Sequence, residues 1–320
     1  MKNKMLIAFV VLVLLLAVGA IIYVLNSSNS ATTTVVEPTN EEEPAEITFP
    51  TDPTEETTPD ETEESAAPAT PQNNAEETLG QSAGGNSLTA YHFGSGEKEI
   101  VFIGGIHGGY SWNTALVAFD TIDWLKNNPD QIPDNVKVTV IPVLNPDGLK
   151  LVTGGTGKFS ASQVNTSQAT QVSGRFNANE VDLNRNFACE WQATGTWQDR
   201  KVSGGAGAFS EPESQAIRTY VNNHKPAAVI TWYSAAGGVY SSSCNNGISA
   251  ETRTLTNLYA KAAGYPAHEE FDYYEITGDM VNWLAGQGIP AISVLLTDRT
   301  NPEWTKNQAG IKAVLSHYAN

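Results

Sequence analysis

The sequence contains few basic residues and almost no cysteine. Among its 320 residues are 18 Lys and Arg, against 35 Asp and Glu, and only two cysteines, Cys189 and Cys244. The shortage of cations argues against an extended basic surface, so we expect no nucleic-acid partner. Two cysteines allow at most one disulfide within the chain. No internal repeat is evident in the sequence.

The segment from Asn26 to about Gly85 contains no Lys or Arg and hardly any aliphatic residue. It consists mainly of Thr, Glu, Pro, Ser and Ala and includes 14 acidic residues. Such a segment cannot bury enough apolar surface to offset the conformational entropy lost on folding. We therefore predict that residues 26–86 form a disordered acidic stalk, which carries most of the chain's net charge of −17.

The N-terminal segment contains a long, strongly apolar run without a charged residue. As a helix, the 21 residues 5–25 would span ~31 Å, which matches the ~30 Å hydrocarbon core of a bilayer. No small-residue cleavage site or lipid-acceptor cysteine follows, which argues against a cleaved signal peptide. Lys2 and Lys4 precede the run, and for a long way after it the charged residues are all acidic. We therefore predict that residues 1–25 are a signal anchor, a single transmembrane helix in the cell membrane with a cytoplasmic N-terminus and an extracellular C-terminal domain.

The rest of the chain, residues 87–320, has a suitable length for one α/β domain. Largely continuous apolar, β-branched runs are typical of buried parallel strands, and they occur at 99–106, 137–144, 227–233 and 290–296. Helical patterns occur at 111–127, 211–224, 280–286 and 307–318. This alternation predicts an α/β fold, in which a mixed, mostly parallel sheet has helices on both faces.

Three motifs follow in order along this domain. The apolar run at 99–106 ends in glycines and His107, and a helical pattern follows at once, so we expect His107 at the carboxyl edge of the sheet, where α/β proteins bind ligands. Asn145-Pro-Asp-Gly148 follows the second strand, and Val181-Asp-Leu-Asn-Arg-Asn186 comes later.

This ordered set of motifs resembles the zinc carboxypeptidase A-like family over residues 87–320, most specifically at Val181-Asp-Leu-Asn-Arg-Asn186. The resemblance implies a zinc ion held by a His-x-x-Glu pair and a distant His, with a late Glu that activates the metal-bound water. Of these residues only His107 is present. Tyr110 or Ser111 and Tyr233 stand at the other ligand positions, and Leu295 stands at the position of the catalytic Glu. The resemblance therefore implies a degenerate zinc site with no intact catalytic residue.

The substrate-holding positions of the family are better retained. Asn184 and Arg185 match the residues that hold the C-terminal carboxylate of the substrate, and Arg175 matches an arginine that polarises the scissile carbonyl. Tyr274 matches a tyrosine that covers the bound substrate. Guanidinium groups suit both tasks, because they form paired hydrogen bonds with carboxylates and stabilise a developing oxyanion.

The two cysteines lie in the part predicted to be outside the cell, where oxidising conditions favour a disulfide between Cys189 and Cys244. Such a bond would tie two site loops together and would stabilise the fold by about 4 kcal/mol on a loop-closure estimate. The alternative is two unpaired cysteines.

The leading hypothesis is a membrane-anchored pseudopeptidase, without a cofactor, that binds a peptide or cell-wall peptide by its C-terminal carboxylate. One alternative is an active zinc metallocarboxypeptidase that removes C-terminal residues with shifted zinc ligands, for which His268, Glu269 and Glu270 are candidates. A third possibility is a structural or interaction module in which the carboxylate pocket has no function.

Overall fold

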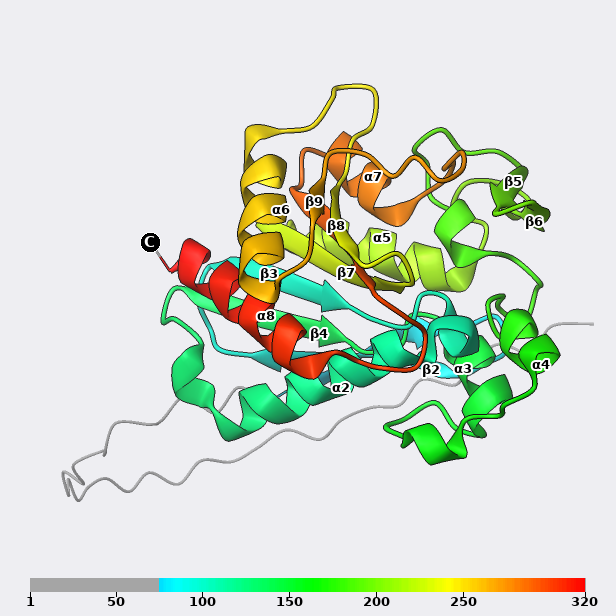
Figure 1. Cartoon of the computed structure of the whole chain (residues 1–320), viewed down its shortest axis with the longest axis horizontal. Coiled ribbons are helices and arrows are strands. Elements are labelled where there is room, and N and C mark those ends of the chain that lie inside the picture. The colour runs from blue at the N-terminus through cyan, green and yellow to red at the C-terminus, as the bar shows by residue number, and fades with distance from the viewer. Residues whose placement is uncertain (1–74, 320) are drawn as a thin grey trace, which may run out of the picture. The chain divides into compact units, whose positions relative to one another are not determined.

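The computed structural model describes residues 75–319, and Figure 1 shows their arrangement. The predicted signal anchor, residues 1–25, lies outside the described residues, as does the predicted stalk up to residue 74. Within the described part, no helix combines the length and the apolar composition needed to cross a membrane. The described residues all belong to one compact unit.

The strands of this unit form an eight-stranded sheet and a two-stranded hairpin. They span Ala75–Gln81 (β1), Ser87–Phe93 (β2), Lys98–Ile103 (β3), Val136–Ile141 (β4), Thr194–Trp197 (β5), Arg200–Ser203 (β6), Ala228–Ser234 (β7), Gly238–Ser241 (β8), Ala267–His268 (β9) and Ala291–Leu296 (β10). The large sheet has the order β1-β2-β4-β3-β7-β10-β8-β9, and β5 pairs with β6. Its central strands β4, β3, β7 and β10 are parallel. The antiparallel pairs are β1 with β2, β2 with β4 and β8 with β10, and the short edge strand β9 pairs parallel with β8. The predicted mixed sheet is confirmed.

The four apolar runs predicted as strands are the four central strands β3, β4, β7 and β10. They read as continuous apolar runs because both of their faces are covered. One predicted boundary is wrong, because β1 lies inside the segment 26–86 that we predicted to be disordered. Most side chains of β1 are exposed, and the strand is held by its antiparallel pairing with β2. Because its side chains bury little surface, the amino-acid composition of β1 resembles that of the acidic stalk.

Seven α-helices accompany the strands in the described part of the chain. They span Trp112–Asn127 (α2), Pro146–Thr153 (α3), Gln168–Ser173 (α4), Pro212–His224 (α5), Ala250–Ala263 (α6), Met280–Gly286 (α7) and Trp304–Tyr318 (α8). The four predicted helices correspond to α2, α5, α7 and α8. Glu211 is the N-cap residue of α5, and its side chain makes no capping hydrogen bond.

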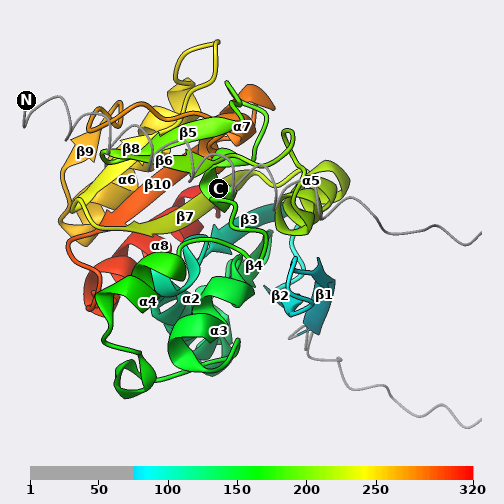
Figure 2. The ribbon, with the colours of Figure 1, turned by 90° about the vertical axis from the view of Figure 1, so that its right-hand side faces the viewer.

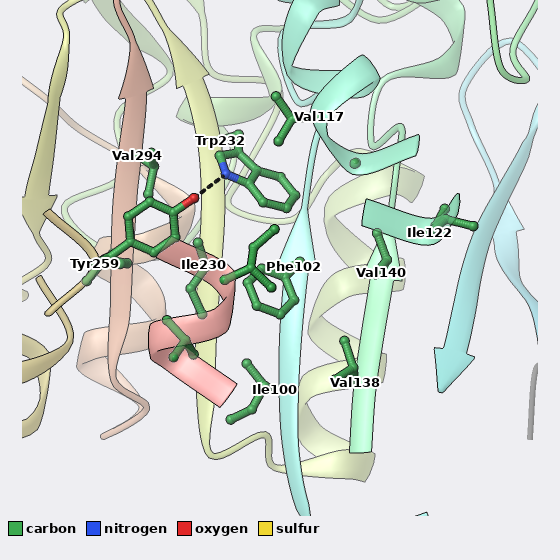
Figure 3. Close-up of a cluster of buried hydrophobic side chains, with 14 of the residues drawn as sticks. Ile100, Phe102, Val117, Ile122, Val138, Val140, Ile230, Trp232, Tyr259 and Val294 are labelled. Carbon is green, nitrogen blue, oxygen red and sulfur yellow. Dashed lines mark hydrogen bonds between the residues drawn. The ribbon is translucent and has the colours of Figure 1, made fainter. Parts of the chain in front are cut away.

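Helices cover both faces of the sheet. In Figures 1 and 2, α6 and α8 lie on one side of the sheet and α5 lies on the other. Alternate residues of each central strand point to opposite faces, so that Phe102 packs in the cluster beneath α2, α6 and α8 while Val101 packs in the cluster beneath α5 and α7. Figure 3 shows the first cluster, in which the indole of Trp232 donates a hydrogen bond of 3.0 Å to the hydroxyl of Tyr259.

The face beneath α5 and α7 also carries two of the predicted site positions. Tyr233 and Leu295 are directly paired in the register of β7 and β10, at the carboxyl ends of the two strands. Both side chains pack in the cluster on that face. The parallel pairing of these strands therefore brings the two positions together, although they are far apart in the sequence.

Candidate functional site

A cavity of about 790 Å³ lies at the carboxyl edge of the parallel strands. The structure gathers most of the predicted site positions in its lining. They are His107, Arg175, Asn184, Arg185, Tyr233, Tyr274 and Leu295. Two other expected metal-ligand positions, Tyr110 and Ser111, do not line it. The cavity is therefore the place where the predicted roles of these residues can be judged.

His107 lies in the turn between β3 and the short 3-10 helix Gly108–Ser111. This 3-10 helix needs glycine because a Cβ atom at Gly109 would lie 2.2 Å from Cγ2 of Val152. Only 6% of His107 is exposed, and neither ring nitrogen has a hydrogen-bond partner within residues 75–319. Burial, and then the nearby Arg175, hold the pKa of His107 well below its ordinary value. The imidazole is therefore neutral.

The surroundings of His107 do not fit a zinc ion. Its nearest carboxylate is that of Asp182, with Oδ1 3.7 Å from Nε2. Tyr233 is no substitute ligand, because burial, and then Asp279, raise its pKa well above its ordinary value. Leu295 is apolar, and the described residues hold no group of three His, Cys, Asp or Glu that could bind a metal ion. Zinc needs three protein ligands in a catalytic site, so we derive no step through a metal ion.

The candidates for shifted ligands do not form a metal site either. The ring of His268 stacks on that of Tyr240 with centroids 4.6 Å apart and an angle of 14°. Glu269 forms an ion pair with Arg253, with Nε and Oε1 3.0 Å apart. The exposed carboxylate of Glu269 is therefore directed to a partner on α6.

Arg175 is fixed by a buried ion pair. Its Nε donates to Oδ2 of Asp182 at 2.9 Å, and its Nη2 lies 2.8 Å from the same oxygen. Burial would raise the pKa of Asp182, but Arg175 and its other cationic neighbours hold this pKa below its ordinary value. The guanidinium also lies over the ring of Trp197, at 4.4 Å from its centroid. Arg175 is therefore placed in the cavity wall by internal contacts.

Asn184 and Arg185 lie in the 3-10 helix Leu183–Arg185, and both make internal hydrogen bonds. Nδ2 of Asn184 donates to Asp279 at 2.7 Å, and its Oδ1 accepts from the hydroxyl of Tyr233 at 3.2 Å. Arg185 donates from Nε and Nη2 to the carbonyl oxygen of Thr196 and from Nη1 to that of Asn184. Because a guanidinium has five N–H groups, two of those of Arg185 stay available to a ligand.

The outer wall of the cavity is aromatic and acidic. Tyr274 lies near Arg185, whose guanidinium carbon is 5.9 Å from the ring centroid. Tyr274 also packs against Phe271 at 5.0 Å. The exposed acids that line the cavity are Glu190, Glu269, Glu270, Asp272 and Glu275. The floor of the cavity therefore carries guanidinium groups, and its rim carries carboxylates.

The predicted disulfide between Cys189 and Cys244 is confirmed, with Cα atoms 6.0 Å apart. It ties the loop after the 3-10 helix to the loop after β8. Backbone hydrogen bonds continue this link, because the N–H of Gly278 donates to the carbonyl of Cys189 at 2.8 Å. The N–H of Phe187 donates to the carbonyl of Gly278 at 3.0 Å. The segment that carries Tyr274 is thereby fastened to the segment that carries Arg185.

Sequence reasoning missed several residues of the site. Asp182 lies inside the motif Val181–Asn186 and Asp279 follows five residues after Tyr274, and these two acids hold Arg175 and Asn184 in place. Arg299 lines the cavity from the loop after β10. We expected His107 at the ligand-binding edge of the sheet because it follows the end of a strand. The same reasoning applies to Arg299, because β10 ends at Leu296, only three residues earlier.

This fold and this cavity define a class of protein, the α/β domains of carboxypeptidase type. Residues 62–313 match the model of the zinc carboxypeptidase family, and the chain therefore belongs to that family. No curated protein matches the chain.

Solved structures show the same fold. Carboxypeptidase A from Helicoverpa armigera is 19% identical, with a TM-score of 0.58 over 77% of this chain and 67% of that chain. Murein-tripeptide amidase from Escherichia coli O157 is 20% identical, with a TM-score of 0.54 over 76% of this chain and 91% of that chain. Bovine thrombin-activatable fibrinolysis inhibitor is 16% identical, with a TM-score of 0.59 over 78% of this chain and 89% of that chain. At these identities the similarity concerns the fold alone.

Proposed function

We propose that this domain is a pseudopeptidase, a catalytically inactive carboxypeptidase-like module that binds peptides by their C-terminal carboxylate. One observation carries the proposal. The four predicted substrate-binding residues line the same cavity as two of the positions at which the family's metal ligands and catalytic base are replaced. Those two positions are Tyr233 and Leu295, whereas the remaining ligand position, Tyr110 or Ser111, does not line the cavity. The retained residues are Arg175, Asn184, Arg185 and Tyr274.

The expected loss of activity is large. A general base typically contributes 10²- to 10⁴-fold to a rate, and Leu295 cannot serve as one. A zinc ion brings the pKa of a bound water to about 7 and polarises a carbonyl, and His107 alone cannot hold this ion. Binding of a carboxylate needs neither group. It needs N–H donors that are held in place, as those of Arg185 are.

The proposal places the domain outside the cell. Residues 1–25 would anchor the chain in the membrane, and the acidic stalk would separate the domain from the membrane surface. Both parts rest on the sequence patterns described above. A cell-wall peptide is a candidate ligand in this location, because one protein of similar fold is a murein-tripeptide amidase.

Binding of paired peptides tests the proposal. A set of short peptides would be compared with the same peptides bearing a C-terminal amide, by calorimetry on the full-length chain. We expect the acids to bind and the amides to bind at least tenfold more weakly. The variant Arg185→Ala should lose this preference, whereas Arg218→Ala, an exposed residue outside the cavity, should keep it.

Other outcomes favour the competing hypotheses. Release of the C-terminal residue from these peptides would show an active metallocarboxypeptidase. Equal binding of acids and amides, unchanged by Arg185→Ala, would leave the domain as a structural or interaction module.

A further inference from the structure

Arg299 occupies a special position in the cavity. It follows β10, the strand that carries Leu295, and it lines the cavity together with His107. Its guanidinium lies over the ring of Tyr110, at 4.6 Å from the centroid, and the guanidinium of Arg175 approaches the same ring at 5.7 Å. Tyr110 is one of the positions at which the family resemblance implies an anionic metal ligand. Here the aromatic ring at that position packs against two guanidinium groups instead.

Arg299 differs from the other two arginines of the cavity because it has no hydrogen-bond or salt-bridge partner in the described residues. Arg175 is paired with Asp182, and Arg185 donates three hydrogen bonds to carbonyl oxygens and interacts with the charge of Asp279. No salt bridge or hydrogen bond of the described residues involves Arg299, and its Nε is buried without a partner. A buried N–H donor without an acceptor is unfavourable.

The charge balance at the floor of the cavity points the same way. Three guanidinium groups face two buried carboxylates, those of Asp182 and Asp279. The residues at the expected metal-ligand and base positions, His107, Tyr110, Tyr233 and Leu295, add no carboxylate. The floor therefore carries one more guanidinium group than carboxylates, at the place where the family resemblance implies a metal ion. A ligand with one negative charge would neutralise it.

We propose that Arg299 takes the place of the metal ion as the cationic centre of the cavity and binds a carboxylate of the ligand. The inference rests on the proposed function and names a residue that the family resemblance does not supply. The ligand class is a carboxylate-terminated peptide. The two Nη groups of Arg299 are not among the buried unpaired atoms and have no hydrogen-bond partner in the described residues, and together they give the paired geometry that a carboxylate accepts.

Variants of Arg299 provide the first test. Arg299→Met removes a guanidinium that lies 4.6 Å from an aromatic centroid, and Arg218→Met removes one that lies 4.7 Å from that of Phe209, outside the cavity. We expect Arg299→Met to weaken binding of a peptide acid at least tenfold and to leave the amide unaffected. Arg299→Lys keeps the charge but not the paired N–H groups of the guanidinium, so its affinity for the peptide acid should fall less. Arg218→Met should bind the peptide acid as the unmodified chain does. Unchanged binding of the acid by Arg299→Met would overturn the inference.

A second measurement does not depend on peptide binding. Acetate, the simplest such carboxylate, would be titrated into the full-length chain while the arginine Nε–H signals are followed by NMR, with acetamide as the neutral control. Comparison with Arg299→Lys assigns the signal of Arg299. A saturable shift of that signal with acetate alone supports the inference even if no tested peptide binds, in which case only the proposed function fails. No shift, or an equal shift with acetamide, would contradict the inference.

Discussion

The two ends of the central strands carry buried polar clusters of opposite character. At the amino end, Oε1 of Glu99 accepts hydrogen bonds from the hydroxyls of Thr139 and Tyr220 and lies 3.1 Å from Nζ of Lys137. Its Oε2 lies 3.3 Å from Nδ1 of His224. None of these side-chain atoms is among the buried polar atoms that lack a partner in the described residues.

At the carboxyl end, by contrast, several buried atoms have no partner. They are both ring nitrogens of His107, the hydroxyl of Ser111 and Nε of Arg299. Buried polar groups in native proteins are rarely left unpaired. The cluster around Glu99, in which no buried polar atom lacks a partner within residues 75–319, is called the closed cluster, and it stabilises the fold. The cluster around His107 and Arg299 is called the open cluster. Three of its unpaired atoms belong to residues that line the cavity, so it is suited to binding a ligand. Differences in stability and binding between variants at the two ends test this distinction.

The largest effect on stability is expected for the buried ion pair between Arg175 and Asp182 at the carboxyl end. Arg175→Met leaves the carboxylate of Asp182 buried without its cation, and we expect a loss of about 3 to 5 kcal/mol in the free energy of unfolding. Urea unfolding measures it. The control is Arg200→Met, because Arg200 lies over the same ring of Trp197 at 5.5 Å but is exposed. Equal losses in the two variants would show that stacking, and not the ion pair, fixes Arg175.

A smaller loss, of about 2 kcal/mol at neutral pH, is expected for Glu99→Gln, because hydrogen bonds to a charged group become hydrogen bonds to a neutral one. Burial would raise the pKa of Glu99, but bonds from Thr139 and Tyr220 and the charge of Lys137 hold it below its ordinary value of 4.5. The stabilisation by Glu99 is therefore present above about pH 4.5 and is lost as the pH falls through the pKa of the folded state. Unfolding measured from pH 7 to pH 3 should show a smaller decrease for Glu99→Gln. Parallel curves would contradict this account.

A still smaller effect on stability is expected for Arg299→Met, within about 1 kcal/mol of the unmodified chain, because no hydrogen bond or ion pair within the described residues is lost. The same substitution should nevertheless have the large effect on peptide binding given above. This combination separates a ligand-binding residue from a structural one. A loss of stability as large as that of Glu99→Gln would show that the open cluster has the same role as the closed one.

The smallest effect concerns the acidic rim. Glu270, Asp272 and Glu275 are exposed at the cavity, so a peptide with a lysine next to its C-terminal residue should bind a few times more tightly than one with glutamate there. The difference should shrink as salt is raised from 0.05 M to 0.5 M, because exposed charges are screened. Calorimetry at the two salt concentrations would measure it. A salt-independent preference would place the lysine away from the rim.

Much of the fold could be predicted from the sequence, because β3, β4, β7 and β10 are covered on both faces and read as continuous apolar runs. The edge strand β1 could not be predicted, because backbone pairing holds it and its side chains resemble those of the stalk. The motifs located the lining of the cavity. They did not reveal that Arg185 is fixed by the carbonyl of Thr196, since the position of the β5–β6 hairpin depends on tertiary packing. Arg299 was missed because it belongs to none of the motifs.

The zinc content of the purified chain tests the central claim most directly. The full-length chain would be dialysed against a trace of zinc, and the bound metal would be measured by mass spectrometry with His107→Ala as the matched variant. We predict a stoichiometry well below one zinc ion per chain, with no difference between the two proteins. One zinc ion per chain, lost in His107→Ala, would contradict the claim that the cavity has no metal centre and instead binds a carboxylate through its arginines.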